Sequence, residues 1–256
     1  CHLRKVSLKS IGLIIVAAIF LFIMADYVNA CSMIAFQNLL DDSLQAIVNK
    51  PVEALVVVAI LPAIIEEFLF RGMIYRGIAN KSNKKIAIII SALLFAFLHM
   101  NFNQMCYAFV MGLVFAIVIY LTDNLSVSIL LHMLFNAFTV IITCFEKSNA
   151  IQAILQCNIA GYTLFNPSLT DTQGKIEISL LIIGGLIAIL SAVIAGWLIL
   201  LIAKTEKTTE TTINNKNILK DNDNIFKNNE KWKPDLRFFA GSGVCILIAI
   251  LYEILL

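Results

Sequence analysis

The feature that most constrains the fold of this 256-residue chain is a series of long apolar segments. A helix needs roughly 20 apolar residues to cross a hydrocarbon core about 30 Å thick, and several of the segments reach or approach that length. The chain is 60% hydrophobic and only 14% charged, whereas soluble domains are about half apolar and about a quarter charged. Because a soluble fold of this size has no room to bury so much apolar surface, the sequence predicts an integral membrane protein.

The hydropathy predicts seven candidate spanning segments and two further apolar stretches that polar residues interrupt. The seven are Leu8–Tyr27, Val52–Ala79, Ile86–His99, Met105–Leu121, Val127–Phe145, Ile178–Ala203 and Phe238–Leu256. The two interrupted stretches, Cys31–Val48 and Ile151–Phe165, are expected to be interfacial helices or additional spans. Continuous apolar runs exclude a membrane β-barrel, whose strands alternate. The predicted fold class is therefore all-α, a polytopic transmembrane helical bundle of seven to eight spans.

Polar residues divide this bundle into three parts. Residues 1–203 are the predicted transmembrane bundle, with residues 52–145 as its core, and residues 236–256 are a C-terminal transmembrane helix. Between them, residues 204–235 are rich in Asn, Lys and Thr. Such a stretch buries too little apolar surface to offset its ordering entropy, so we expect a flexible cytoplasmic loop.

Basic residues predict the orientation of the chain, because short cytoplasmic loops carry an excess of Lys and Arg. These residues gather near the N-terminus, in the turn after the second long segment and in the predicted loop. We therefore expect a cytoplasmic N-terminus. A bias toward Asn, Ile and Lys indicates an AT-rich genome and a bacterial plasma membrane. A net charge of +2 without a concentrated basic face argues against a nucleic-acid partner.

Neither the cysteines nor the first segment adds a further site. The six cysteines are scattered without metal-binding spacing and are expected to behave as small apolar residues. Cys1 at the start indicates a sequence without its initiator end. The basic start and the apolar run that follows are similar to a signal peptide, but no small-residue cleavage site comes after them. This segment is therefore predicted to be a first spanning helix.

Charged residues lie in the middle of the second apolar segment, which reads A-I-L-P-A-I-I-E-E-F-L-F-R. An ionisable group near the bilayer centre costs ~3 kcal/mol or more, so such residues are functional candidates. Glu67 and Arg71 are four residues apart and share a helix face, which favours a supporting ion pair. Glu66 points about 100° away from that pair. A buried carboxylate on this separate face suits a general base, so Glu66 is the candidate catalytic residue.

Two of the three histidines also lie in apolar segments: His99 ends S-A-L-L-F-A-F-L-H, and His132 lies within S-I-L-L-H-M-L-F-N. At ~1.5 Å per residue, Glu66 and His99 both lie ~20 Å from the cytoplasmic ends of their helices. Asn136 follows His132 by four residues and shares its helix face. These residues are predicted to meet in a polar cavity within the membrane.

The segment that ends at His99 has about 14 apolar residues, too few to span the bilayer. A polar stretch with Asn101 and Asn103 follows it, and irregular backbone at this depth must line protein or water. Water in such a cavity is what a hydrolase requires. If the helix continues past His99, Asn103 lies on the same face and is a candidate supporting residue.

Three short motifs follow one another on these segments. E-E-x-x-x-R spans Glu66 to Arg71, F-x-x-x-H spans Phe95 to His99, and H-x-x-x-[N/D] spans His132 to Asn136. In this order the motifs resemble those of the CAAX prenyl protease and bacteriocin-processing family, also called the Abi or CPBP family of intramembrane proteases. The resemblance covers about the middle third of the chain and says little about either end.

The resemblance implies an endopeptidase that acts on a membrane-associated protein or peptide, with Glu66 and His99 activating a water molecule. His132 and Asn136 would then stabilise the oxyanion, a role worth a few kcal/mol. Glu66, His99 and His132 are also suited to a three-ligand zinc site. The motif H-E-x-x-H is nevertheless missing, and a glutamate-based mechanism explains Asn136 better. We therefore favour no metal cofactor, with zinc as the alternative.

Two other functions compete with a protease. One is a non-catalytic membrane protein, such as an immunity factor against bacteriocins, in which the same polar residues only build a core. The other is a transporter that uses Glu66 and the histidines as a proton relay. The lack of internal repeats and the single polar cluster disfavour a transporter. No prenyl-binding signature is readable, so the substrate stays open.

Overall fold

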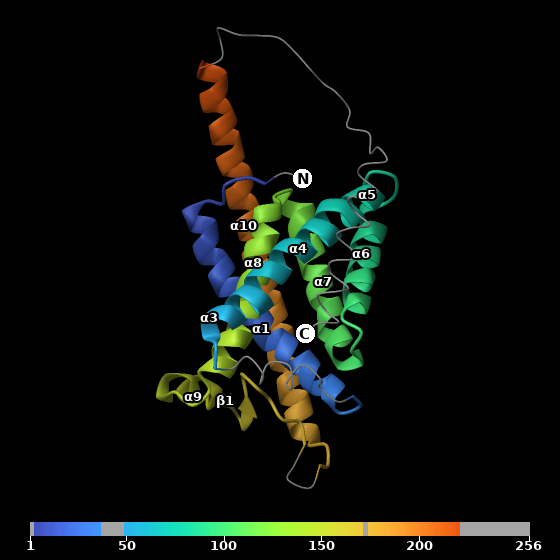
Figure 1. The fold of residues 1–256 in the computed structure, drawn as a ribbon, viewed down its shortest axis with the longest axis vertical. Coiled ribbons are helices and arrows are strands. Elements are labelled where there is room, and N and C mark those ends of the chain that lie inside the picture. The colour runs from blue at the N-terminus through green and yellow to red at the C-terminus, as the bar shows by residue number, and fades with distance from the viewer. Residues whose placement is uncertain (1–2, 37–48, 171–173, 221–256) are drawn as a thin grey trace.

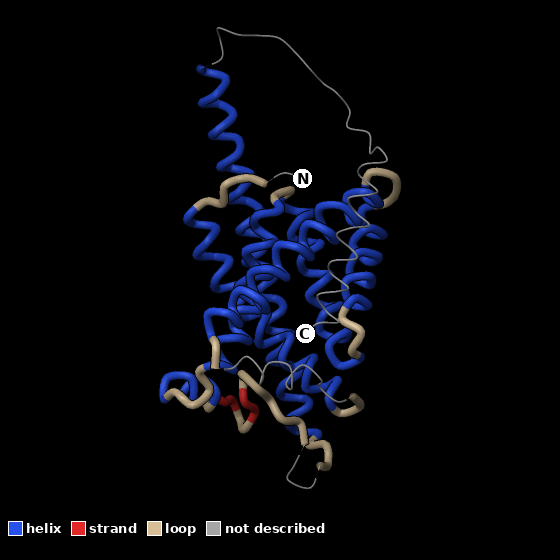
Figure 2. The backbone as a smooth tube through the Cα atoms, in the orientation of Figure 1, coloured by secondary structure: helices blue, strands red, loops and turns tan. Residues whose placement is uncertain are grey.

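The computed structural model describes residues 3–36, 49–170 and 174–220. In these ranges the chain is a bundle of helices with one small two-stranded sheet (Figures 1 and 2). The all-α prediction is therefore confirmed. The predicted helix Phe238–Leu256 and most of Cys31–Val48 lie outside the described residues.

Four long helices form the centre of the bundle: α1 (Leu8–Met33), α7 (Phe102–Thr122), α8 (Leu125–Cys144) and α10 (Ile178–Lys220). Their buried side chains form one main core, which also includes residues from the second predicted span. Among the described residues, four helical stretches are long and apolar enough to cross a membrane: Leu8–Met33, Phe102–Thr122, Leu125–Cys144 and Ile178–Thr209. The prediction of seven to eight spans is thus supported for four helices.

The second predicted span is helical from residue 51 to residue 79 but is not one regular helix. Its parts are α3 (Pro51–Ala54), the π-helical η1 (Leu55–Ile60), α4 (Leu61–Glu67), the π-helical η2 (Phe68–Tyr75) and α5 (Arg76–Ala79). Proline cannot donate an N–H to the helix and its ring crowds the carbonyl four residues earlier, so a proline at position 62 disturbs the ladder. π segments often accompany functional sites. In Figure 1 this cyan run crosses α8 obliquely.

The third predicted span is the short helix α6 (Lys84–Leu98), of 15 residues. At ~1.5 Å per residue it is about 22 Å long, less than the hydrocarbon thickness. Met100, with φ of 49°, ends the helix in the left-handed region. The Asn101 side chain then accepts from the Asn103 N–H at 3.1 Å and begins α7. Helices α6 and α7 pack so closely at Gly112 that a Cβ there would lie only 3.0 Å from the Ala92 Cα.

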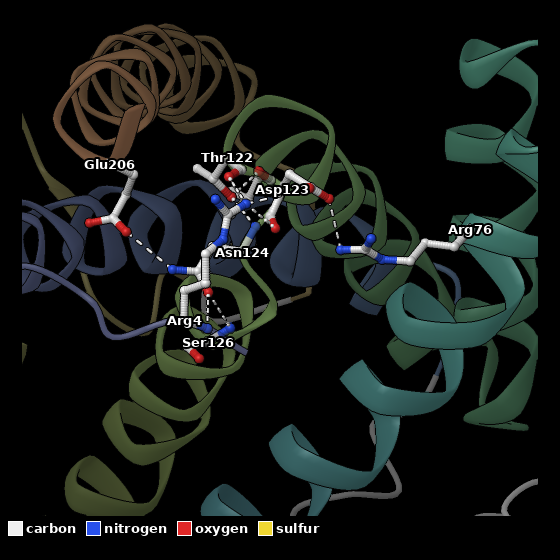
Figure 3. A network of polar contacts seen from close by, with 8 residues as sticks. Arg4, Arg76, Thr122, Asp123, Asn124, Ser126 and Glu206 are labelled. Atoms are coloured by element: carbon white, nitrogen blue, oxygen red, sulfur yellow. Dashed lines mark hydrogen bonds and ion pairs between the residues drawn. The ribbon is translucent and has the colours of Figure 1, made fainter. Parts of the chain in front are cut away.

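Polar residues from the N-terminal segment, α5 and α10 gather around the turn between α7 and α8 (Figure 3). Asp123, in the turn between α7 and α8, forms an ion pair with Arg76 (Nη2 to Oδ1, 2.9 Å) and another with Arg4 (Nη2 to Oδ2, 3.4 Å). Asn124 donates its side-chain N–H to Glu206 of α10 at 3.1 Å. The N-terminal segment, α5 and α10 therefore share one side, and the cytoplasmic orientation of this side stays a prediction.

Helix α10 continues to Lys220, so the expected flexible loop cannot begin at residue 204. Glu206 holds the extension to the bundle, because it also accepts the backbone N–H of Ser7 at 3.2 Å. Thr209 donates its hydroxyl to the carbonyl of Thr205 at 2.9 Å within the helix. The 32-residue stretch Ile178–Thr209 is about 48 Å long at ~1.5 Å per residue. It therefore projects beyond a 30 Å core, and residues 221–235 lie outside the described part.

The interrupted stretch Ile151–Phe165 is not a span. Helix α9 (Asn149–Leu155) is followed by strands β1 (Asn158–Ile159) and β2 (Tyr162–Thr163), which pair antiparallel. Ala160 and Gly161, with φ of 50° and 86°, form the tight turn that hairpins favour. The hairpin docks through Tyr162, whose burial raises the pKa of its hydroxyl. Figure 1 shows α9 and β1 at the end opposite the ion-pair network.

Candidate active site

Glu67 is the centre of the polar cluster and is fully buried. It accepts from Arg71 Nη1 at 2.9 Å, from Ser128 Oγ at 2.5 Å and from His132 Nδ1 at 3.1 Å. Three donors from two helices converge on one carboxylate, so Glu67 acts only as an acceptor. The predicted Glu67–Arg71 pair is present, and Glu67 is also the group that binds His132 to the second helical run.

Glu67 fixes which nitrogen of His132 carries a proton. The carboxylate can only accept, so we assign the N–H to Nδ1 from its partner. The other ring nitrogen, Nε2, then lies 3.8 Å from Oε2 of Glu66. The Phe115 ring stacks on the face of the His132 ring, with centroids 4.6 Å apart. One histidine therefore lies between the two adjacent carboxylates and presents a different nitrogen to each.

Arg71 is fully buried and balances the charge of Glu67. Its Nη2 donates to the carbonyl of Gly112 on α7 at 3.0 Å. Its guanidinium also lies over the Phe95 ring, 4.4 Å from the centroid, in a cation–π contact. The Glu67–Arg71 pair thus connects the second helical run to α6, α7 and α8, which is the supporting role expected from its spacing.

His99 reaches the cluster through Phe95. The Phe95 ring contacts His99 at 5.0 Å and His132 at 5.8 Å between centroids, so both histidines border the same aromatic ring. Nδ1 of His99 lies 2.9 Å from the Phe95 carbonyl oxygen, which can only accept. In the neutral ring Nε2 of His99 therefore keeps its lone pair. His99 caps the end of α6 and is half-buried.

Asn136 lies one helical turn beyond His132 and is half-buried. Its Nδ2 donates to the carbonyl oxygen of Val58 in η1 at 3.1 Å. The amide nitrogen therefore faces the second helical run, and one of its two hydrogens is already bonded.

Asn103 is buried, but its contacts lie elsewhere. Its Nδ2 donates to Ser32 Oγ at 2.6 Å, and Ser32 belongs to α1. The helix does not continue past His99, because Met100 has a left-handed backbone, so the expected shared face does not form. The structure therefore places Asn103 between α7 and α1, and its supporting role at the cluster stays a prediction.

Ser128 is the site residue that the sequence interpretation missed. It is fully buried and donates to Glu67 Oε2. A signal existed, because Ser128, His132 and Asn136 follow one another at intervals of four residues and share one face of α8.

The alternative zinc set of Glu66, His99 and His132 is not grouped as a metal site in this arrangement. Within the described ranges, no three His, Cys, Asp or Glu side chains are grouped so that they could hold a metal ion. His132 bonds through Nδ1 to Glu67 and His99 through Nδ1 to a backbone carbonyl. Both keep Nε2, as metal-binding histidines do, so the zinc alternative stays a prediction. We derive no step through a metal from this geometry.

The fold and the cluster define a class: a membrane-embedded helical protein with a buried carboxylate–histidine site. Residues 48–138, which include all seven predicted site residues, match the family described as type II CAAX prenyl endopeptidase Rce1-like. Residues 48–138 are thus similar to this CAAX prenyl endopeptidase family of membrane proteases.

Two relatives share this region. The membrane-embedded CAAX protease MroQ of Staphylococcus aureus (strain USA300) is 34% identical over 116 residues, 43% of this chain and 47% of that protein. The putative membrane peptidase YdiL of Bacillus subtilis (strain 168) is 31% identical over 87 residues, 34% of this chain and 36% of that protein. The matches thus span less than half the length of each relative. No solved structure matches the chain significantly.

Proposed function

We propose that this chain is an intramembrane endopeptidase that hydrolyses a peptide bond of a membrane-associated protein or peptide. The observation that carries the proposal is the position of His132, with Nδ1 at 3.1 Å from Glu67 and Nε2 at 3.8 Å from Glu66. The family match over residues 48–138 and the similarity to a CAAX protease support it. Our proposal does not require a prenyl group on the substrate.

The placement of protons supports separate roles for the two carboxylates. If Glu66 were ionised and His132 neutral, two lone pairs would face each other across 3.8 Å in a buried site. The pair is better described as sharing one proton. With that proton on His132 Nε2, Glu66 is an ionised general base and His132 is an N–H donor. Glu67 and Arg71 stabilise this state because Glu67 accepts from the Nδ1–H of the imidazolium.

From this state we propose the following reaction. Glu66 takes one proton from a water molecule, and the Nε2 lone pair of His99 accepts a hydrogen bond from the same water. The water oxygen attacks the peptide carbonyl carbon, and the carbonyl electrons move to the oxygen. His132 Nε2–H and the second N–H of Asn136 donate to this oxyanion. Glu66 then returns its proton to the amide nitrogen as the C–N bond breaks, which yields a carboxylic acid and an amine; the acid afterwards loses its proton to solvent.

We place the site in a bacterial plasma membrane, with the N-terminus in the cytoplasm. The two relatives are bacterial, and Arg4 of the N-terminal segment and Arg76 both pair with Asp123 at one end of the bundle (Figure 3). Glu66 is only 4% exposed. Because the surrounding helices cover it, we expect the substrate to reach it from the lipid or through a water-filled path. The substrate is thus expected to be a membrane protein or a membrane-bound peptide.

The decisive experiment compares Glu66→Gln with Glu53→Gln in the purified protein and in cells. Glu53 is in the same helical run, but its side chain is 65% exposed in a surface ion pair with Lys50. Mass spectrometry should find membrane peptides trimmed in the wild type and the Glu53 variant but not in the Glu66 variant. A Glu66 variant that folds and still trims the same peptides, or that keeps an immunity phenotype in full, would refute the proposal. Chelator-resistant cleavage is expected, and activity restored only by zinc would overturn the metal-free reaction.

A further inference from the structure

The hydrogen bond of Asn136 has an unusual partner. A helical carbonyl oxygen normally accepts from the N–H four residues later. Val58 lies in the π-helical η1, whose carbonyls accept from the N–H five residues later, just before α4, where the partner is four residues later. Its α-helical partner would be position 62, which is a proline and has no N–H. Pro62 is buried at the start of α4, and Asn136 of α8 donates to the Val58 carbonyl at 3.1 Å. The side chain from α8 therefore supplies a hydrogen bond to a carbonyl that the chain's own helix cannot serve in the usual way.

We propose that Pro62 is a positioning residue, which acts by leaving the Val58 carbonyl to orient the amide of Asn136. This inference rests on the proposed function, in which Asn136 donates to the oxyanion. It adds a role for the break in the second helical run. The interruption of the regular ladder by proline, between the π-helical η1 and α4, creates the acceptor that the site needs.

The chemistry of the two groups determines the direction of the amide. A carbonyl only accepts, so the nitrogen and not the oxygen of Asn136 faces Val58. The amide nitrogen has two hydrogens, and one of them is used in this bond. The second is left to donate elsewhere in a fixed direction. An Asn136 side chain without this partner can turn over and present its oxygen to the developing oxyanion, which repels it.

A Pro62→Ala variant tests this role directly. Alanine gives position 62 an N–H that can bond to Val58 in place of Asn136. We expect kcat to fall about tenfold, less than the ~100-fold or greater loss of removing an oxyanion donor, because the donor is misdirected and not deleted. KM should be unchanged. Alanine favours a helix interior more than proline does, so the midpoint of thermal unfolding should be unchanged or higher.

Pro51→Ala is the matched control, since Pro51 opens α3 at a position where a missing N–H has no consequence. Its kcat should equal that of the wild type. In an Asn136→Ala background, Pro62→Ala should cause no further fall in kcat, because the group through which it acts is gone. If Pro62→Ala lowered kcat by the same factor in the Asn136→Ala background as in the wild type, the proposal would be overturned. An unchanged kcat in the single Pro62→Ala variant would also overturn it.

A second measurement does not depend on cleavage. In protein labelled with ¹⁵N on asparagine and held in detergent micelles, the side-chain resonance of Asn136 is assigned by its loss in Asn136→Ala. We expect this resonance to shift in Pro62→Ala and to stay in place in Pro51→Ala. An unshifted resonance in Pro62→Ala would refute the orienting bond. If the resonance shifts but no variant or wild type cleaves any peptide, the proposed function fails and the positioning of Asn136 stands.

Discussion

Substitution of Glu67 by alanine tests whether its carboxylate is needed to compensate the buried charge of Arg71 and to accept the hydrogen bonds of its neighbours. Glu67 and Arg71 are both 0% exposed and 2.9 Å apart. Removal of one partner of a buried pair typically costs about 3–5 kcal/mol, because the other charge is left without compensation. Ser128 and His132 lose their acceptor as well. We therefore expect Glu67→Ala to lower the free energy of unfolding by at least about 3 kcal/mol, measured by denaturant titration in detergent with circular dichroism.

The same change at a surface pair is the control. Glu53 lies 3.2 Å from Lys50, but both side chains are about two-thirds exposed, and exposed pairs contribute about 0–1 kcal/mol. Glu53→Ala should therefore leave the unfolding midpoint nearly unchanged. In the Glu67→Ala background, Arg71→Met removes the uncompensated charge and should recover much of the lost stability. A Glu67→Ala protein within about 1 kcal/mol of the wild type, or no recovery with Arg71→Met, would refute this reasoning.

Three further substitutions test separate contacts. Gly184→Ala should lower the thermal midpoint, because a Cβ there would meet the Tyr162 ring at 2.4 Å, whereas Gly196→Ala, on the same helix with nothing within 4 Å, should not. Ser128→Ala removes a donor from buried Glu67 and should cost about 1–3 kcal/mol in the same unfolding titration. Asp123→Asn removes the charge from two partly exposed ion pairs, keeps a residue that tolerates the left-handed φ of 49°, and should cost about 1 kcal/mol or less at low salt. That loss should vanish at 1 M salt, where the screening length falls to about 3 Å; an equal loss at both salt concentrations would contradict it.

The sequence predicted the parts of the site that depend on one helix. Four-residue spacing predicted that Glu67 and Arg71 share a face, and they form an ion pair at 2.9 Å. The contacts of Glu67 with Ser128 and His132 depend on how α8 packs against the second helical run, and no local period encodes that packing. Sequence reasoning could therefore name the pair but not the acceptor role that connects it to the histidine.

The sequence was less informative where tertiary contacts or backbone details override composition. Asn103 was expected to share a face with His99 only if the helix continued. A left-handed Met100 ends the helix, and methionine gives no signal for that conformation. The helix continues past Ala203 into a polar stretch because Glu206 bonds to the N-terminal segment and to the turn before α8. Composition predicts disorder for such a stretch only when nothing else in the fold holds it.

The helix phase that separates Glu66 from Glu67 also separates their chemistry. Three donors surround Glu67, so that carboxylate has no place for a proton and stays an acceptor. Glu66 points to the other side of the same histidine, 3.8 Å from Nε2. In the proposed reaction, Glu67 would stabilise a proton on Nε2 through the ring, which would leave Glu66 ionised when water must be deprotonated. Two adjacent carboxylates with different partners can thus divide the work, one holding the charge of the histidine and the other exchanging protons with the substrate.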